Sequence, residues 1–178
     1  EISLLSAMRM PLERSGDYYR MLVDFERKRL RLSREIGDHY AEAHAMMFCG
    51  QIEGLWLGDY EAGLELEQES LEIYSGITAS VYPLLRIAQM EAELGHTEAA
   101  LAVLERAHPI GEQEVRDIGR AGLGMVRAIV YNACWDVDHL FMAIEAGEDV
   151  CRMVDQQLVS EQYKIAAFCE MSAAHLGL

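Results

Sequence analysis

Histidine and cysteine are the side chains of this sequence most suited to binding a metal ion, and the chain has six of the first and four of the second. His39 and His44 lie five positions apart on a predicted helix, which separates them by about 140° around its axis. They therefore do not converge on one ion. No cysteine forms a Cys-x-x-Cys pair or lies at zinc-finger spacing from a histidine. We expect neither a metal site nor a cofactor.

The cysteines all fall among apolar residues of helical patterns: Cys49, Cys134, Cys151 and Cys169. The alternative is that the chain is secreted and that its four cysteines form two disulfides. However, this chain is long enough to bury a core without covalent links, and no basic, apolar signal peptide begins it. We therefore expect reduced, buried thiols in a cytoplasmic protein.

The motifs that place a nucleophile or cradle a phosphate are missing from this sequence. The segment Gly122-Leu123-Gly124 has two glycines, but it lacks the third glycine and the preceding strand of a nucleotide-binding loop. There is no Gly-x-Ser-x-Gly and no His-Glu-x-x-His. Carboxylate pairs such as Glu65/Glu69 and Glu91/Glu145 are typical of a solvated acidic helix face. We expect no enzymatic activity.

The charge of the chain is strongly acidic and unevenly distributed. It has 15 Lys and Arg against 30 Asp and Glu, a net charge of −15. Residues 1–34 carry +3 and residues 35–178 carry −18. This excess of acid disfavours direct binding to nucleic acid or to anionic membranes. The basic run of residues 27–34 has two interpretations, a solvated helix face or a docking surface for an acidic protein.

Helical periodicity dominates the sequence, and alternation typical of strands is nearly absent. The longest uncharged stretch, residues 73–85, is too short to span a membrane. The chain begins at Glu1 inside an apolar pattern, so we expect a piece of a longer protein. The predicted helices cover residues 2–14, 17–36, 39–57, 59–74, 80–94, 97–107, 113–133, 136–154 and 156–176.

One short turn recurs along the chain, each time between two helical stretches. Its copies are Gly16-Asp17-Tyr18-Tyr19, Gly58-Asp59-Tyr60-Glu61 and Gly95-His96-Thr97-Glu98, with a degenerate fourth at Cys134-Trp135-Asp136-Val137. The copies begin 42, 37 and 39 residues apart. Glycine suits the left-handed conformation that ends a helix, and the next polar residue suits the start of another. The recurrence predicts a repeat architecture.

A helix, a Gly-Asp-Tyr turn and a second helix with small residues seven positions apart resemble the tetratricopeptide repeat. Residues 57–74 carry the resemblance most fully, with Gly63 and Ser70 at the small positions. Ala88, Ala100 and Ala107 hold such positions in the next copy, whereas the first copy departs from the pattern. Small side chains there allow the two helices of a hairpin to touch.

The resemblance implies an all-α, right-handed α-solenoid of about nine helices over residues 1–178. Its repeats cover about residues 1–37, 38–76, 77–110, 111–154 and, in part, 155–178. The period exceeds the usual length of about 34 residues. It is similar to the longer arrays of bacterial multidomain signalling and transcription regulators.

In the register of that family, an apolar stripe of residues 39–57 lines the concave groove, together with residues of later helices. An exposed apolar groove marks a partner site, although such a stripe is more often core. The predicted groove residues are Phe48, Ile52, Leu55, Trp56, Tyr82, Gln89, Glu93, Met125 and Ile129.

The last predicted helix is apolar on nearly every side. Leu158, Ile165, Cys169 and Leu176 share one face, which we expect to pack on the fourth repeat. Phe168 and Met171 point elsewhere and form a predicted edge for self-association as a homodimer. The alternative is that this helix folds inward as a cap.

We therefore expect a non-catalytic scaffold that binds a protein or peptide partner along its groove, or that contacts neighbouring modules of its parent chain. The alternative from another class is a small-ligand sensor of a bacterial regulator. A peptide groove should carry polar clamps such as Arg86, Gln89 or Asn132, whereas a sensor should enclose its ligand.

Overall fold

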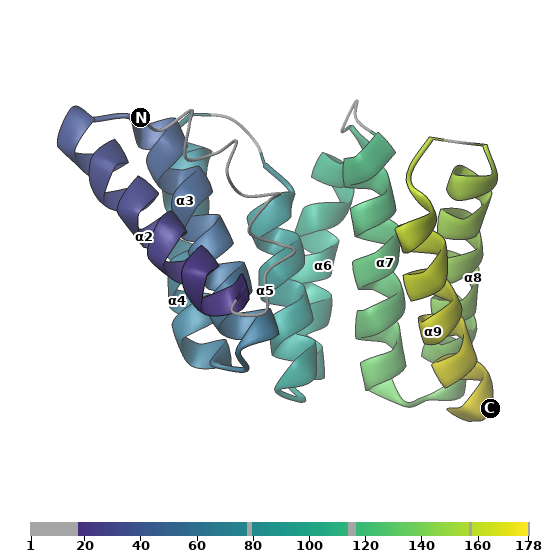
Figure 1. The fold of residues 1–178 in the computed structure, drawn as a ribbon. Coiled ribbons are helices and arrows are strands. Elements are labelled where there is room, and N and C mark those ends of the chain that lie inside the picture. The colour runs from purple at the N-terminus through teal and green to yellow at the C-terminus, as the bar shows by residue number, and fades with distance from the viewer. Residues whose placement is uncertain (1–17, 78–79, 114–116, 157, 178) are drawn as a thin grey trace. The chain divides into compact units, whose positions relative to one another are not determined.

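The computed structural model describes residues 18–77, 80–113, 117–156 and 158–177 (Figure 1). Those residues form eight α-helices and one π-helical turn, and they contain no strand. The predicted all-α class is confirmed. The helix predicted over residues 2–14 and the turn glycine Gly16 lie outside the described residues.

Two compact units, residues 1–86 and 87–178, make up the chain. The first contains α2 (Tyr18–Ile36), α3 (His39–Gln51), the π-helical turn η1 (Ile52–Trp56) and α4 (Tyr60–Ser75). The boundary falls within α5 (Tyr82–Glu93). The second contains α6 (Thr97–Glu112), α7 (Asp117–Cys134), α8 (Val137–Asp155) and α9 (Glu161–Gly177). A single array of five repeats stays a prediction.

The turns between helices follow from local chemistry. Gly58 and Gly95 have φ of +81° and +79°, as the repeated turn predicts. The side chains of Asp59 and Asp136 accept the backbone N–H of the third residue along, which satisfies a donor at the start of α4 and of α8. In the fourth copy, Trp135 and not Cys134 occupies the left-handed position, with φ of +54°. The predicted register was wrong there by one residue, because the left-handed residue directly precedes the capping aspartate, as Gly58 precedes Asp59.

Small residues bring α3 and α4 together in the first unit. A Cβ on Gly50 would lie 2.9 Å from the carbonyl oxygen of Gly63, so the two backbones are in close contact. Two turns away along both helices, the Ser70 hydroxyl donates to the carbonyl of Ala43 at 2.8 Å. The predicted role of Gly63 and Ser70 in this hairpin is confirmed.

The basic run of α2 is used inside the first unit. Arg27 pairs with Glu53 and Arg34 pairs with Glu42, each at 2.8 Å. Arg29 is buried, lies 3.0 Å from the buried carboxylate of Glu26 and contacts His44. Much of the run therefore connects α2 to α3 and η1.

Glu67 of α4 is the most unusual side chain of the first unit. It is fully buried, and neither carboxylate oxygen has a hydrogen-bond partner among the described residues. Its Cγ lies where a side chain on Gly50 would be. Burial raises the pKa of Glu67 well above its usual range, although the charge of Arg86 opposes this shift.

Close contacts at glycine hold the helices of the second unit together. A Cβ on Gly111 would lie 2.7 Å from Leu123, one on Gly124 would lie 2.6 Å from Val150, and one on Gly147 would meet Met171. These contacts join α6 to α7, α7 to α8 and α8 to α9. Fully buried alanines fill the space around them, among them Ala121, Ala128, Ala143, Ala167 and Ala174.

Two helix limits differ from those predicted by five residues. The helix expected to stop before Pro109 continues to Glu112, with the proline inside it. Gly111 is buried against Leu123 of α7, so tertiary packing outweighs the missing N–H of proline. The last helix starts at Glu161 and not at residue 156, and the N–H of Leu158, in the connection before it, donates to the carbonyl of Met153 near the end of α8.

The predicted packing face of the last helix was wrong. Leu158, Ile165, Cys169 and Leu176 are all exposed. Ala167 and Ala174 are fully buried, and Met171 packs on Gly147 of α8 rather than pointing away. The close approach at Gly147 favours the face of α9 with the smaller side chains. The large apolar side chains consequently remain on the surface.

Candidate functional site

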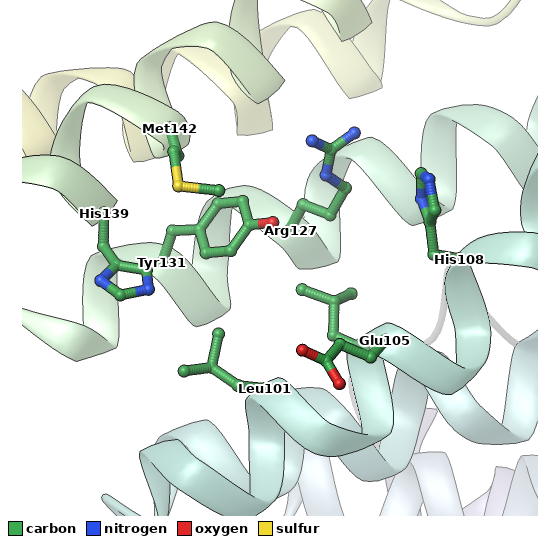
Figure 2. Close-up of a pocket in the computed structure, with 8 residues that line it drawn as sticks. Leu101, Glu105, His108, Arg127, Tyr131, His139 and Met142 are labelled. Atoms are coloured by element: carbon green, nitrogen blue, oxygen red, sulfur yellow. The ribbon is translucent and has the colours of Figure 1, made fainter.

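A hollow of about 400 Å³ lies over α6, α7 and α8 in the second unit (Figure 2). Its apolar lining comes from Leu101, Leu104, Tyr131 and Met142, and its polar lining from Glu105, His108, Arg127 and His139. The lining residues of α6 follow one another at helical spacing, so they share one face of that helix. Three helices thus combine apolar surface with a few charged groups, as is usual for ligand sites.

Aromatic and cationic side chains order the centre of this hollow. The guanidinium of Arg127 lies 5.9 Å from the centre of the Tyr131 ring, within the range of a cation–π interaction. The ring of His139 lies 5.7 Å from that of Tyr131. Figure 2 shows Tyr131 beside Met142, with its hydroxyl directed towards the side of the hollow where Arg127 lies.

The start of α8 orients His139. Its backbone N–H and its Nδ1 both contact the carboxylate of Asp136, at 3.0 and 2.5 Å. These hydrogen bonds from His139 lower the pKa of Asp136. Because Nδ1 is engaged, Nε2 is the ring nitrogen of His139 that is left to contact a ligand.

A second hollow of about 340 Å³ continues along the same three helices. Its lining residues are Glu112, Arg120, Leu123, Gly124, Arg127, Asp149, Val150, Arg152, Met153 and Gln156. Arg127 lines both hollows. On α7 the lining positions run from Arg120 to Tyr131 along one face, a length of about 16 Å. We call the two hollows together the α7 trough.

The two halves of the α7 trough differ in chemistry. The half around Tyr131 is mainly apolar, whereas the half around Arg120 carries most of the charge. In the charged half, Arg152 pairs with Asp149. Among the described residues, Arg127, at the junction, has no carboxylate within ion-pair distance, and Glu105 has no cation within that distance.

The side chains that line the α7 trough determine what chemistry it can support. Among its described lining residues there is no serine, threonine or cysteine to act as a nucleophile next to His139. No group of three or more His, Cys, Asp and Glu side chains is placed to hold a metal ion in the described ranges. What the trough offers a ligand is apolar contact, a guanidinium and an oriented imidazole.

The predicted groove residues fall in both units. In the first unit, Ile52 is 1% exposed and packs with Leu22 and Val23 of α2, with Trp56 partly buried against them. This part of the stripe is core, not an open surface. Phe48 lies within the same contact of helices, with Arg29 over its ring. Leu55 and Tyr82 are half-buried.

In the second unit, Gln89, Met125 and Ile129 are half-buried and Glu93 is exposed. Met125 and Ile129 lie on the side of α7 away from Arg127 and Tyr131. Asn132, expected as a polar clamp, donates instead to the carbonyl and the carboxylate of Glu170 in α9. Binding by the predicted groove residues stays a prediction.

Sequence reasoning missed the residues of the α7 trough. Arg120, Arg127 and Tyr131 recur at intervals of seven and four residues, which places them on one helix face. Residues 117–134 contain one acid, Asp117, against two arginines, in a chain that is acidic as a whole, and the spacing of those arginines was the available signal. The contributions of α6 and α8 could not be read from spacing, because they depend on how the helices pack.

The two residues of the predicted self-association edge differ in exposure, since Phe168 is exposed and Met171 is half-buried. Phe168 is 51% exposed and lines a separate hollow together with Met171.

All four cysteines are free, as predicted. Cys49 is buried, which raises its pKa to about 12. Cys169 is exposed, so the prediction that all four are buried was wrong.

None of the described helices has both the length and the apolar composition needed to cross a bilayer. Comparisons with known proteins found no matching family model, no matching curated protein and no matching solved structure.

Proposed function

We propose that this chain is a non-catalytic binding domain of the tetratricopeptide type, and that its α7 trough holds a segment of a partner protein. The observation that carries the proposal is the trough itself. It runs for about 16 Å along one face of α7, longer than a compact small molecule needs. Its mixed apolar and charged lining suits side chains of several kinds.

The repeat assignment rests on the helical hairpins. Turns of like geometry precede α4, α6 and α8, and small residues lie where α3 and α4 touch. A right-handed solenoid is the arrangement that such hairpins form when they stack. In this proposal the chain contributes a scaffold within a signalling or regulatory protein, and the partner lies across several of its helices.

A small-ligand sensor is the second candidate. The apolar half of the trough favours it, because Arg127, Glu105 and His139 surround a hollow of about 400 Å³. That volume is within the range of small-molecule sites. In this alternative the ligand would occupy one half of the trough only.

The test is selection of a random peptide library displayed on phage against the whole chain, followed by calorimetric titration of the recovered peptides. We expect peptides with affinities in the micromolar range. Met142→Arg should abolish their binding, because Met142 lines the trough.

Phe141→Arg is the matched control, since Phe141 neighbours Met142 in α8, is 59% exposed and does not line the trough. Circular dichroism should show both variants folded. If no peptide is recovered from wild type, or if Phe141→Arg removes binding and Met142→Arg does not, the proposed function is wrong. Stabilisation of wild type by a small metabolite alone would favour the sensor.

A further inference from the structure

The dimensions and the charges of the α7 trough point to a particular kind of segment, an inference that rests on the proposed function. An extended peptide rises about 3.3 Å per residue, so about five residues span the 16 Å between Arg120 and Tyr131. A helical segment would present about eleven residues over that length. The trough therefore suits a short, extended segment.

Basic side chains are concentrated in the trough. Residues 87–178 contain six Lys and Arg against 15 Asp and Glu, and three of those six line the trough: Arg120, Arg127 and Arg152. Arg152 is already paired with Asp149. Arg127 is half-buried, contacts the ring of Tyr131 and has no acidic partner among the described residues. A guanidinium in that position is suited to bind a carboxylate through two parallel hydrogen bonds.

The spacing of Arg127 and Tyr131 fits an extended chain. Four residues along α7 separate them by about 6 Å. Side chains two positions apart in an extended peptide point to the same side and are separated by about 6.6 Å. Next to Tyr131, Leu101 and Met142 provide an apolar surface for a large side chain.

We propose that the α7 trough binds an extended segment in which an Asp or Glu carboxylate pairs with Arg127 and a bulky apolar side chain two positions away packs beside Tyr131. Three acidic residues line the trough, and the two that are not Asp149, the partner of Arg152, limit the charge of this segment. Glu105 lies in the apolar half and Glu112 at the far end, so a second acid at either place would meet a like charge. The segment carries one acid at its centre rather than a run of acids.

The experiment uses the whole chain and the peptides selected on it from the random library. The recovered peptides should share an Asp or Glu two positions from Leu, Ile, Met, Phe or Tyr, in either order. Replacing that acid by its amide should weaken binding to wild type about tenfold, and Arg127→Gln should weaken binding of the original peptide by a similar factor.

The two changes together should weaken binding little more than either one alone, because they remove the same contact. Arg106→Gln, at an exposed arginine of α6 outside the trough, should change affinity less than about twofold. If Arg127→Gln does not fold, comparing the acid peptide with its amide on the wild-type chain still tests the pairing.

Three results would overturn this inference. Recovered peptides without an acid, or independent effects of the two changes, would exclude the pairing with Arg127 and leave the proposed function standing. Recovery of no peptide at all would overturn both this inference and the proposed function.

Discussion

The two units differ in where their charged side chains lie. The first buries Glu26, Arg29 and Glu67, each at 3% exposure or less. The second buries no Asp, Glu, Lys or Arg among its described residues, and its helices meet at glycine and alanine. Three of its arginines line the α7 trough instead. Charged residues of one chain can thus lie in the core of one unit and line a surface hollow in another.

This difference has an energetic consequence. A buried ion pair is costly to break, since the remaining charge loses its partner in a medium of low dielectric. A core of small residues is instead sensitive to added volume. The chain allows each unit to be followed separately, because it has two tryptophans, Trp56 in the first unit and Trp135 in the second.

The largest effect should come from breaking the buried pair of the first unit. Arg29→Ala removes the cation that lies 3.0 Å from Glu26, so we expect a loss of about 3–5 kcal/mol in the free energy of unfolding. Arg152→Ala, which removes an exposed pair of the second unit, should cost less than about 1 kcal/mol. Urea unfolding followed by fluorescence in Trp135→Phe and Trp56→Phe backgrounds measures the two units. Equal losses would contradict the contrast between buried and exposed charge.

Added volume should affect the second unit next most strongly. Ala167→Leu places a large side chain at a fully buried position of α9 and should cost about 1–3 kcal/mol. Ala173→Leu makes the same change at an exposed position of the same helix and should be nearly neutral. Thermal and urea unfolding of both variants check this. A neutral Ala167→Leu would mean that α9 packs through its other face.

The pH dependence of the first unit should reveal Glu67. Its pKa is raised in the folded state above the ordinary value of 4.5, so folding favours the protonated form. Its contribution is fully present below about pH 4.5 and is lost as the pH rises towards the folded pKa, by about 1.4 kcal/mol per pH unit.

Glu67→Gln cannot ionise and should remove that slope from urea unfolding measured between about pH 5 and about pH 8. It should therefore be more stable than wild type at the upper end of the range. Glu69→Gln, at an exposed neighbour on α4, should keep the wild-type slope. A wild-type stability that does not fall over this range would show that Glu67 ionises without cost.

The smallest effect on folding is expected at the surface of α9. Ile165 is 69% exposed and Phe168 is 51% exposed, so this helix presents large apolar side chains to solvent. We predict a homodimer through it, which Phe168→Asp should dissociate while leaving the circular dichroism spectrum unchanged. Light scattering at micromolar concentration measures this. A monomeric wild type would remove the prediction, and a dimer that survives Phe168→Asp would place the interface elsewhere.

Much of the local structure was predictable from the sequence, because it depends on neighbouring residues. Glycine followed by a capping residue predicted the turns at Gly58 and Gly95, and periodicity predicted the helices with most of their limits. The small positions Gly63 and Ser70 were found because helices approach closely only where side chains are small. Each of these inferences needs only residues close in the chain or a known hairpin pattern.

Only the tertiary structure decided which surfaces became core and which became site. The stripe around Ile52 is core because α2 covers it, and the apolar face of α9 is exposed because the Gly147 contact selects the alanine face. The α7 trough takes its lining from three helices, so no periodicity within one helix reveals it. Helical spacing determines which residues share a face, but what that face meets depends on contacts between residues far apart in the sequence.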